Sequence, residues 1–330
     1  NSHRQKPNII FIFADDLGWA DLPVYGYNKI SHPAGWQVRG DVHMPNIKRL
    51  TEEGTLFTQF YVAAPTCTPS RVGILSGQYP SKLKMYAPII QDLHFNESRG
   101  IPNYMDYTVP TVMKSLKQNA YRIGHFGKWH IGINKDGSAP FPERYGVDEY
   151  KDCRDGINGR PGSTELIADK TIEFIQKHKN EPFYINTWLF DPHAPLNPSA
   201  EEMKDYQTLS QESKFTGALQ IWYTVLSRID KHVGRILKEL DDLGLSKNTI
   251  VIFSSDNGAE SGQMPHTSHF ASASSVESGP FRGIKRSLYE GGIREPFIVR
   301  WPGKVAAGKV DSTSVISSVD YFPSICAVTG

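Results

Sequence analysis

The chain has 330 residues, of which 39% are hydrophobic and 11% aromatic, enough to bury a sizeable core. Its 36 basic and 35 acidic side chains give a net charge of +1, which argues against a protein that binds nucleic acid through a generally basic surface. No apolar run reaches the roughly 20 residues that a membrane helix needs, so we expect no membrane span. The first residues, NSHRQKPN, contain no signal-peptide core, so the protein is either cytosolic or has lost a leader.

Apolar and amphipathic segments alternate along the chain. NIIFIFA (8–14) has the continuous apolar pattern of a strand that is buried on both faces of a sheet. In chain order, we expect strands at 8–14, 55–62, 121–127, 182–190, 248–255 and 295–303, and helices at 44–54, 69–75, 108–120, 164–178 and 218–243. This alternation predicts an α/β fold with a large, mostly parallel sheet that is flanked by helices on both faces.

Polar side chains follow four of the expected strands directly. Because ligands of open α/β sheets bind outside the carboxyl ends of the strands, we expect these side chains to share one edge. Each also has a purely structural interpretation, since acidic pairs cap helices, Asp-Asn-Gly forms turns, and a histidine between prolines is commonly a loop residue. In chain order they are Asp15 and Asp16, Lys128 and His130, His193, and Asp256 and Asn257.

These residue types suit the binding of a tetrahedral oxyanion beside a divalent cation. Carboxylate and amide oxygens prefer Ca²⁺ or Mg²⁺ to zinc. Arg71, Lys128 and a further lysine would neutralise the oxyanion, and the two histidines exchange protons near neutral pH. Cys67 lies at the mouth of the helix that carries Arg71, within CTPSRVGILSG (67–77). The sequence therefore predicts a site that binds and attacks a sulfate or phosphate ester.

The cysteines do not form a disulfide framework. Cys67, Cys153 and Cys326 are an odd and sparse set. This leaves a bridge between Cys153 and Cys326 open, and at least one cysteine has another role.

CTPSRVGILSG resembles the signature of the type I sulfatases, which belong to the alkaline-phosphatase-like superfamily. Other segments are similar to further motifs of this family and follow in the family's order: FADDLGWADL, GKWHIG, DPHAP, FSSDNGA and FRGIKRSLYEGGIREPFIVRWPG. In type I sulfatases the cysteine is oxidised to formylglycine (3-oxoalanine), and the hydrate of this aldehyde is the nucleophile. The resemblance implies that Cys67 is a substrate for a formylglycine-generating enzyme or an anaerobic sulfatase-maturing enzyme.

The resemblance also implies a role for each polar position. The ligands of one divalent cation, Ca²⁺ rather than Mg²⁺, would be Asp15, Asp16, modified Cys67, Asp256 and Asn257. The catalytic residues would be Cys67, Arg71, Lys128, His130, His193 and Lys285. Among these, Lys128 and Lys285 would contact the sulfate. His193, alone or together with Lys285, would protonate the departing oxygen, and His130 would later accept the proton of the second hydroxyl.

The resemblance also implies that residues 1–330 form the N-terminal catalytic α/β domain of a sulfatase-like fold. Family members normally continue into a smaller C-terminal subdomain, which is absent from this sequence, so we expect a truncated or cleaved chain. A cleaved chain would associate with its separate C-terminal fragment. Because sulfatases that act on glycans usually work outside the cytoplasm, we expect a periplasmic or secreted protein whose signal peptide was removed.

The segments expected at the mouth of the pocket contain aromatic and cationic side chains. Such side chains suit a sulfated oligosaccharide or polysaccharide, because sugar rings stack on aromatic side chains and sulfate groups pair with cationic ones. The substrate is then either an algal galactan or a glycosaminoglycan, and these residues favour both over a small aryl sulfate. Arginine and histidine are also ordinary solvated loop residues. The candidates are Trp36, His94, Arg99, Arg154, Arg160, His269 and Arg282.

Two other functions are compatible with these residues. A phosphodiester or phosphonate monoester hydrolase of the same superfamily is the first, because residue types alone do not separate sulfate from phosphate. A non-catalytic protein that binds sulfated glycans is the second, although every expected catalytic position is occupied.

Overall fold

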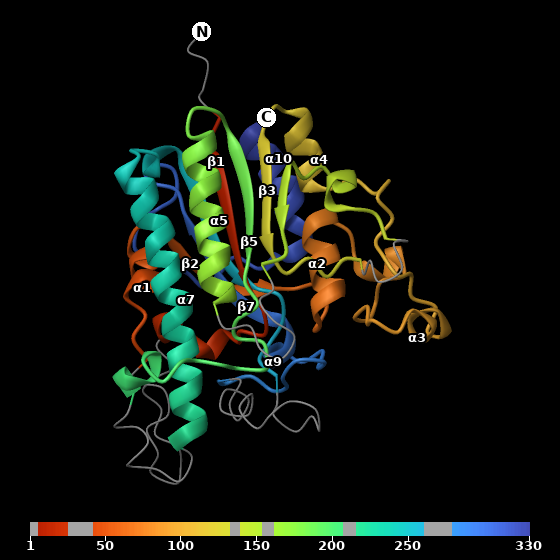
Figure 1. The fold of residues 1–330 in the computed structure, drawn as a ribbon, viewed down its shortest axis with the longest axis horizontal. Coiled ribbons are helices and arrows are strands. Elements are labelled where there is room, and N and C mark those ends of the chain that lie inside the picture. Colours follow the sequence, from red (N-terminus) through yellow and green to blue (C-terminus); the bar gives the residue numbers. More distant parts are fainter. Residues whose placement is uncertain (1–5, 26–41, 133–138, 154–161, 207–215, 261–278) are drawn as a thin grey trace.

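The sheet is the central element of the protein. A computed structural model describes residues 6–25, 42–132, 139–153, 162–206, 216–260 and 279–330, without the side chains of residues 216–219. Within these residues, nine strands form one sheet in the order β4-β3-β5-β1-β6-β7-β2-β8, with β9 beside β2 (Figure 1). The strands are β1 Asn8–Ala14, β2 Thr55–Tyr61, β3 Arg122–Gly127, β4 Glu149–Lys151, β5 Phe183–Trp188, β6 Thr249–Ser255, β7 Arg294–Arg300, β8 Lys309–Asp311 and β9 Ile316–Ser317.

The direction of the strands confirms the expected mostly parallel sheet. In the described part of the chain only β7 forms antiparallel ladders, one with β6 and one with β2. The ladders of β1 with β5 and with β6 are parallel, as are those of β3 with β4 and with β5. The expected strand at 295–303 is therefore the reversed one, and two short strands, β8 and β9, follow it.

Helices cover both faces of the sheet and bury two hydrophobic cores. Alternate residues of β1 belong to different cores, with Ile10 and Ile12 on one face and Ile9 and Phe11 on the other. Helices α1, α5 and α7 pack in the first core, and α2, α4 and α10 in the second (Figure 1). The helices are α1 Pro45–Glu52, α2 Cys67–Ser76, α3 Leu93–Ser98, α4 Val112–Gln118, α5 Ser163–His178, α7 Thr216–Asp242, α9 Glu290–Ile293 and α10 Tyr321–Thr329.

Burial on both faces explains why β1 is a continuous apolar run: each of its residues is buried. None of the helices in the described residues combines the length and apolarity required to cross a bilayer. The three cysteines are all free thiols, so the bridge between Cys153 and Cys326 that the sequence left open is not formed.

The parallel register brings the carboxyl ends of four strands together. Ala14 at the end of β1 pairs with Ser255 at the end of β6, and Phe13 pairs with Trp188 at the end of β5. Trp188 in turn pairs with Gly127 of β3. The residues that follow these strands therefore leave the sheet at one edge, as the sequence predicted.

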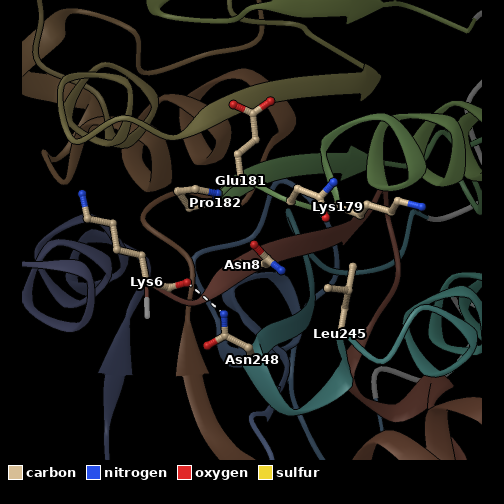
Figure 2. Close-up of a pocket in the computed structure, with 8 residues that line it drawn as sticks. Lys6, Asn8, Lys179, Glu181, Pro182, Leu245 and Asn248 are labelled. Atoms are coloured by element: carbon tan, nitrogen blue, oxygen red, sulfur yellow. Dashed lines mark hydrogen bonds between the residues drawn. The ribbon is translucent and has the colours of Figure 1, made fainter. Parts of the chain in front are cut away.

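The opposite edge of the sheet holds a surface pocket of about 380 Å³. Asn8 begins β1 there, and Pro182 and Asn248 directly precede β5 and β6. In Figure 2 the side chain of Asn248 donates from Nδ2 to the carbonyl oxygen of Lys6, at 2.9 Å. None of the predicted site residues within the described ranges lines this pocket.

Candidate active site

The turn after β1 presents two buried carboxylates. Asp15 and Asp16 are 0% and 1% exposed. The backbone amide of Asp16 donates to Asp256 Oδ1 at 3.1 Å, which ties the ends of β1 and β6 together. Asp16 has a φ of 67°, in the left-handed region that costs energy for a residue with a side chain. This conformation turns two successive carboxylates toward the same part of the edge.

Cys67 is the first residue of α2 and lies against these carboxylates. Its Sγ is 3.6 Å from Asp15 Oδ1, and the side chain is 3% exposed. Burial raises the pKa of the Cys67 thiol to about 12, although Lys128 and Lys285 act to lower it. The residue is therefore a neutral thiol at pH 7, and a neutral thiol is a poor nucleophile.

Arg71 lies one helical turn after Cys67 and is completely buried. Its guanidinium lies over the rings of Phe13 and Trp188, 5.4 and 4.9 Å from their centroids. Nε and Nη2 donate to Asp256 Oδ2 at 3.0 and 2.7 Å. A buried guanidinium held by two donors to a carboxylate and by two aromatic faces is a fixed positive charge. The arginine that the helix dipole disfavours at this position is thus held by tertiary contacts.

Two lysines from distant segments end on the β1 carboxylates. Lys128 Nζ is 2.5 Å from Asp15 Oδ2, and Lys285 Nζ is 2.7 Å from Asp16 Oδ2. Burial acts to raise the pKa of Asp15, but Lys128 and other nearby cations outweigh it and hold the pKa well below its usual value. Both aspartates are therefore charged at neutral pH.

A divalent cation fits the donors at this edge. Ligand atoms of Asp15, Asp16, Cys67 and His193 all lie within 4.8 Å of one another. Asn257 donates from Nδ2 to Asp16 Oδ1 at 2.7 Å, while its buried Oδ1 has no hydrogen-bond partner among the described residues. An unpartnered amide oxygen beside carboxylates is the kind of ligand that Ca²⁺ and Mg²⁺ prefer.

The geometry fixes which ring nitrogen of His130 carries the proton. Nε2 lies 2.9 Å from the carbonyl oxygen of Ile89, and because a carbonyl only accepts, Nε2 is the donor. Nδ1 is then a bare acceptor, buried and unpartnered among the described residues. Burial, followed by Lys128, lowers the pKa of His130 well below its usual value. His130 is therefore a neutral ring with a free lone pair.

His193 faces Asp16 from the loop after β5. Its Nδ1 donates to the carbonyl oxygen of Ala194 at 2.6 Å, and its Nε2 lies 3.7 Å from Asp16 Oδ2. Burial lowers the pKa of His193 to about 4, although Asp16 and Asp15 act to raise it. The structure thus joins His193 to the predicted metal and catalytic positions, all of which meet at this edge.

Three of the predicted substrate-binding residues lie in the described part of the chain, and the contacts of these three are made outside this cluster. Trp36, Arg154, Arg160 and His269 lie outside the described residues. His94 is on α3 with 98% of its side chain exposed, and it pairs with Glu97. Arg99 donates to the carbonyl oxygen of Pro88 at 3.0 Å, next to the residue that binds His130. The guanidinium of Arg282 lies 3.9 Å from the ring centroid of Tyr289.

Two buried glutamates of the site were not predicted. Glu260 accepts from Lys285 at 3.1 Å and from Arg286 at 2.5 Å, so Lys285 is shared between Glu260 and Asp16. Glu295 of β7 is fully buried, and neither carboxyl oxygen has a hydrogen-bond partner in the described structure. Burial, and next Asp256, raises the pKa of Glu295 well above its usual value. The sequence feature that could have predicted Glu295 is its position as an acidic residue inside an otherwise apolar strand.

The fold and this edge define an α/β protein in which buried carboxylates, cations and histidines converge at the carboxyl ends of parallel strands. The sequence model of the sulfatase family matches residues 7–330. The chain therefore belongs to the sulfatase family, as its motifs indicated.

Two named sulfatases are similar to almost the whole chain. The N-acetylgalactosamine-6-sulfatase of Rattus norvegicus is 31% identical over 366 residues, which cover 99% of this chain and 62% of the relative. The N-acetylgalactosamine-6-O-sulfatase of Bacteroides thetaiotaomicron is 30% identical over 413 residues, which cover 99% and 73%. This chain thus spans about three fifths of the length of the rat relative.

A solved structure has the same fold. It comes from work on the metabolism of multiple glycosaminoglycans by Bacteroides thetaiotaomicron. The two structures superpose with a TM-score of 0.77 at 27% identity, covering 99% of this chain and 78% of the other. The shared fold covers the sheet and the edge that carries the site.

Proposed function

We propose that this protein hydrolyses sulfate esters on glycans, with 6-sulfated N-acetylgalactosamine as the substrate class. The observation that carries the proposal is the convergence of buried carboxylates, buried cations and two histidines around Cys67. The similarity to two N-acetylgalactosamine-6-sulfatases supports the choice of substrate. Because both are named sulfatases, they also favour sulfate over the phosphate esters that residue types alone leave open.

Cys67 would act as formylglycine rather than as a thiol. Its raised pKa of about 12 makes the thiol itself a poor nucleophile. The hydrated aldehyde supplies two hydroxyls: one attacks sulfur and displaces the glycan oxygen, and the other loses its proton so that the carbon–oxygen bond to sulfate breaks. Sulfate leaves and the aldehyde is restored, a step that a serine, with its single hydroxyl, does not allow.

The buried cations of the chain would stabilise the charge that develops on the sulfate oxygens. Lys128 and Lys285 end at the carboxylates beside Cys67, and Arg71 is fixed behind them. Prearranged positive charges in a site that excludes water stabilise such a transition state strongly. A divalent cation at Asp15, Asp16, Asp256 and Asn257 would supply further positive charge and favour ionisation of the attacking hydroxyl.

The two histidines would move the protons. His130, whose Nδ1 has a free lone pair, would accept the proton of the second hydroxyl. His193 would protonate the departing glycan oxygen from Nε2. Its pKa of about 4 applies without substrate, and the negative charge of a bound sulfate raises the pKa of a neighbouring imidazole.

The proposal includes maturation and location. A formylglycine-generating enzyme or an anaerobic sulfatase-maturing enzyme would convert Cys67, and Ca²⁺ would be the resident cation. The protein would act in the periplasm or outside the cell, where sulfated glycans occur.

Peptide mass and paired substrates test the proposal together. The peptide containing Cys67 should have the mass of the aldehyde or its hydrate, and the protein should cleave N-acetylgalactosamine 6-sulfate in preference to the matched 6-phosphate. A Cys67→Ala variant should be inactive on both. Retained hydrolysis by that variant, or a preference for the phosphate, would contradict the proposal.

A further inference from the structure

The loop that carries His193 is anchored at Asp191, two residues before the histidine. Asp191 is 7% exposed, and its Oδ2 accepts from Thr164 Oγ1 at 2.6 Å and from Arg228 Nη1 at 3.3 Å. Its carbonyl oxygen accepts from the backbone amide of Asp15 at 3.2 Å. The start of the loop is thus connected both to the catalytic edge and to a buried arginine.

The same arginine holds the far end of this loop. Arg228 lies on α7 and is 7% exposed. Its Nε and Nη2 donate to the two carboxylate oxygens of Glu202, at 2.6 and 2.8 Å, and Nη2 also donates to the carbonyl oxygen of Asn197 at 3.3 Å. Glu202 belongs to the short helix Glu202–Tyr206. The guanidinium of Arg228 therefore binds both ends of the segment from residue 191 to residue 202.

This clamp is well suited to fix geometry. Paired donors to one carboxylate give a planar, directional contact, and burial keeps water from replacing it. Removing the arginine would leave Asp191 and Glu202 without their shared counterion, so the two ends of the loop would repel each other. The clamp belongs to α7 and not to the catalytic edge itself.

The His193 ring depends on the loop for its place. Its backbone amide donates to Phe190 at 2.9 Å, and its Nδ1 donates to the adjacent Ala194, so both bonds stay within the loop. The contact that reaches outward is the 3.7 Å approach of Nε2 to Asp16 Oδ2. A shift of the loop would therefore shift Nε2, the nitrogen that would donate a proton to the substrate, relative to the carboxylates.

We propose that Arg228 is a positioning residue that, by clamping Asp191 and Glu202, holds Nε2 of His193 at the departing oxygen of the substrate. The inference rests on the proposed function for the identity of the reaction. The inference has a consequence for specificity. The clamp should increase the rate of hydrolysis of esters whose leaving oxygen needs a proton, such as sugar sulfates. It matters little for 4-nitrophenyl sulfate, whose leaving group departs as a stable anion.

Two variants and a matched control test this role. Arg228→Met removes the clamp, and Glu202→Gln weakens it at a position where the side chain is more exposed and the fold tolerates change. Arg235→Met is the control, because Arg235 lies two turns further along α7 and pairs with Asp169 of α5 near the surface. Rates are measured on N-acetylgalactosamine 6-sulfate and on 4-nitrophenyl sulfate, with enzyme in excess where turnover is slow.

We expect both clamp variants to lose about tenfold to 100-fold in kcat on the sugar sulfate, with a much smaller loss on the nitrophenyl ester. The control should change neither rate. Equal losses on the two esters, or no loss on the sugar sulfate, would overturn the inference.

A second measurement separates failure of the inference from failure of the proposed function. An unaltered, matured protein that cleaves neither ester contradicts the proposed function. The ring nitrogen NMR signals of His193, assigned with His193→Gln, then decide the inference alone. Arg228→Met should shift or broaden them and Arg235→Met should not, whereas unchanged signals would overturn the positioning role.

Discussion

Asn257 shows how one side chain can report on a bound cation. Its Nδ2 is used by Asp16 and Gly258, whereas its Oδ1 has no hydrogen-bond partner in the described part of the chain. A cation that takes this oxygen binds the folded protein and not the unfolded one, so it should raise the melting temperature.

We expect Ca²⁺ to stabilise the protein through Asn257. At a concentration about 100 times Kd the gain is about 2.7 kcal/mol. Asn257→Leu should show most of this gain lost in calorimetric scans with and without Ca²⁺. Asn180→Leu, at the pocket on the opposite edge, is the control and should keep the full shift. Equal shifts in both variants would show that the cation binds elsewhere.

His125 allows a prediction about stability at low pH. The ring is completely buried in β3, and burial lowers its pKa to about 3. Since an unfolded histidine has a pKa near 6.5, the unfolded chain binds more protons than the folded one below that pH. The contribution of His125 is therefore fully present above about pH 6.5 and is lost as the pH falls toward 3.

Between pH 6.5 and 5 this ring alone should cost about 2 kcal/mol of unfolding free energy. His125→Gln keeps a donor toward the Lys128 carbonyl. In urea unfolding, this variant should lose about 2 kcal/mol less unfolding free energy than the unaltered protein between pH 6.5 and 5. The other buried histidines are present in both proteins, so their contributions cancel in the difference. An identical slope would mean that His125 is protonated in the folded state.

At the scale of elements, the end of β3 depends on a glycine. Gly127 has a φ of 106°, and a Cβ there would lie 1.8 Å from the carbonyl oxygen of Trp188 on β5. The next residue, Lys128, donates its backbone amide to the same carbonyl at 2.9 Å. A side chain at residue 127 would thus separate β3 from β5 directly before Lys128, a residue of the candidate site.

We expect Gly127→Ala to lower the unfolding free energy by about 3 kcal/mol or more, because a backbone clash adds to the strain of a positive φ. Gly303→Ala is the control: φ is 75° there, but nothing lies within 4 Å of the added Cβ. It should cost about 1 to 2 kcal/mol, the strain alone. Chemical denaturation measures both, and equal costs would show that the strands adjust without penalty.

The elements could be predicted from sequence wherever one physical cause dominated. Strands such as β1 have continuous apolar runs because they are buried on both faces, and the polar residues after them mark the edge of the candidate site. The start of α2 was placed at Pro69, two residues late. A proline is tolerated within the first turn of a helix, where the amides have no partner inside the helix, so it marks that turn and not its first residue.

What the sequence did not predict depends on long-range contacts. The reversal of β7 leaves no local mark in an apolar strand, because its partners β6 and β2 are far away in the chain. Glu260 follows Asp256 in an ordinary loop, and only Lys285 and Arg286, brought beside it by folding, reveal its role. The clamp at Arg228 was hidden in the same way, within a helix whose apolar stripe was its only visible pattern.

At the scale of the whole molecule, the two cores share the strand β1. Ile10 and Ile9 of this strand face opposite cores, so loosening either core also disturbs the sheet that supports the other. We expect Ile10→Ala and Ile9→Ala each to lower the unfolding free energy by about 2 to 5 kcal/mol. Val315→Ala, at a residue that is 69% exposed, should have almost no effect.

The shared strand also predicts one unfolding transition for both cores. Trp188 reports on the second core and Trp222 on the first, so single-tryptophan variants should lose their fluorescence signals at the same denaturant concentration. Separate midpoints would indicate that the faces of the sheet unfold independently.

The edge with the pocket of Figure 2 is also where both ends of the described chain lie. Lys6 borders that pocket, and Asn119, which binds Lys6, donates to the carbonyl oxygen of Gly330 at 3.1 Å. A bead or electrode surface coupled through Lys6 or Gly330 would thus hold the protein by the edge opposite Cys67. The opposite edge, with Cys67, would face the solution, so immobilisation at these positions should leave the approach of a large polymer unobstructed.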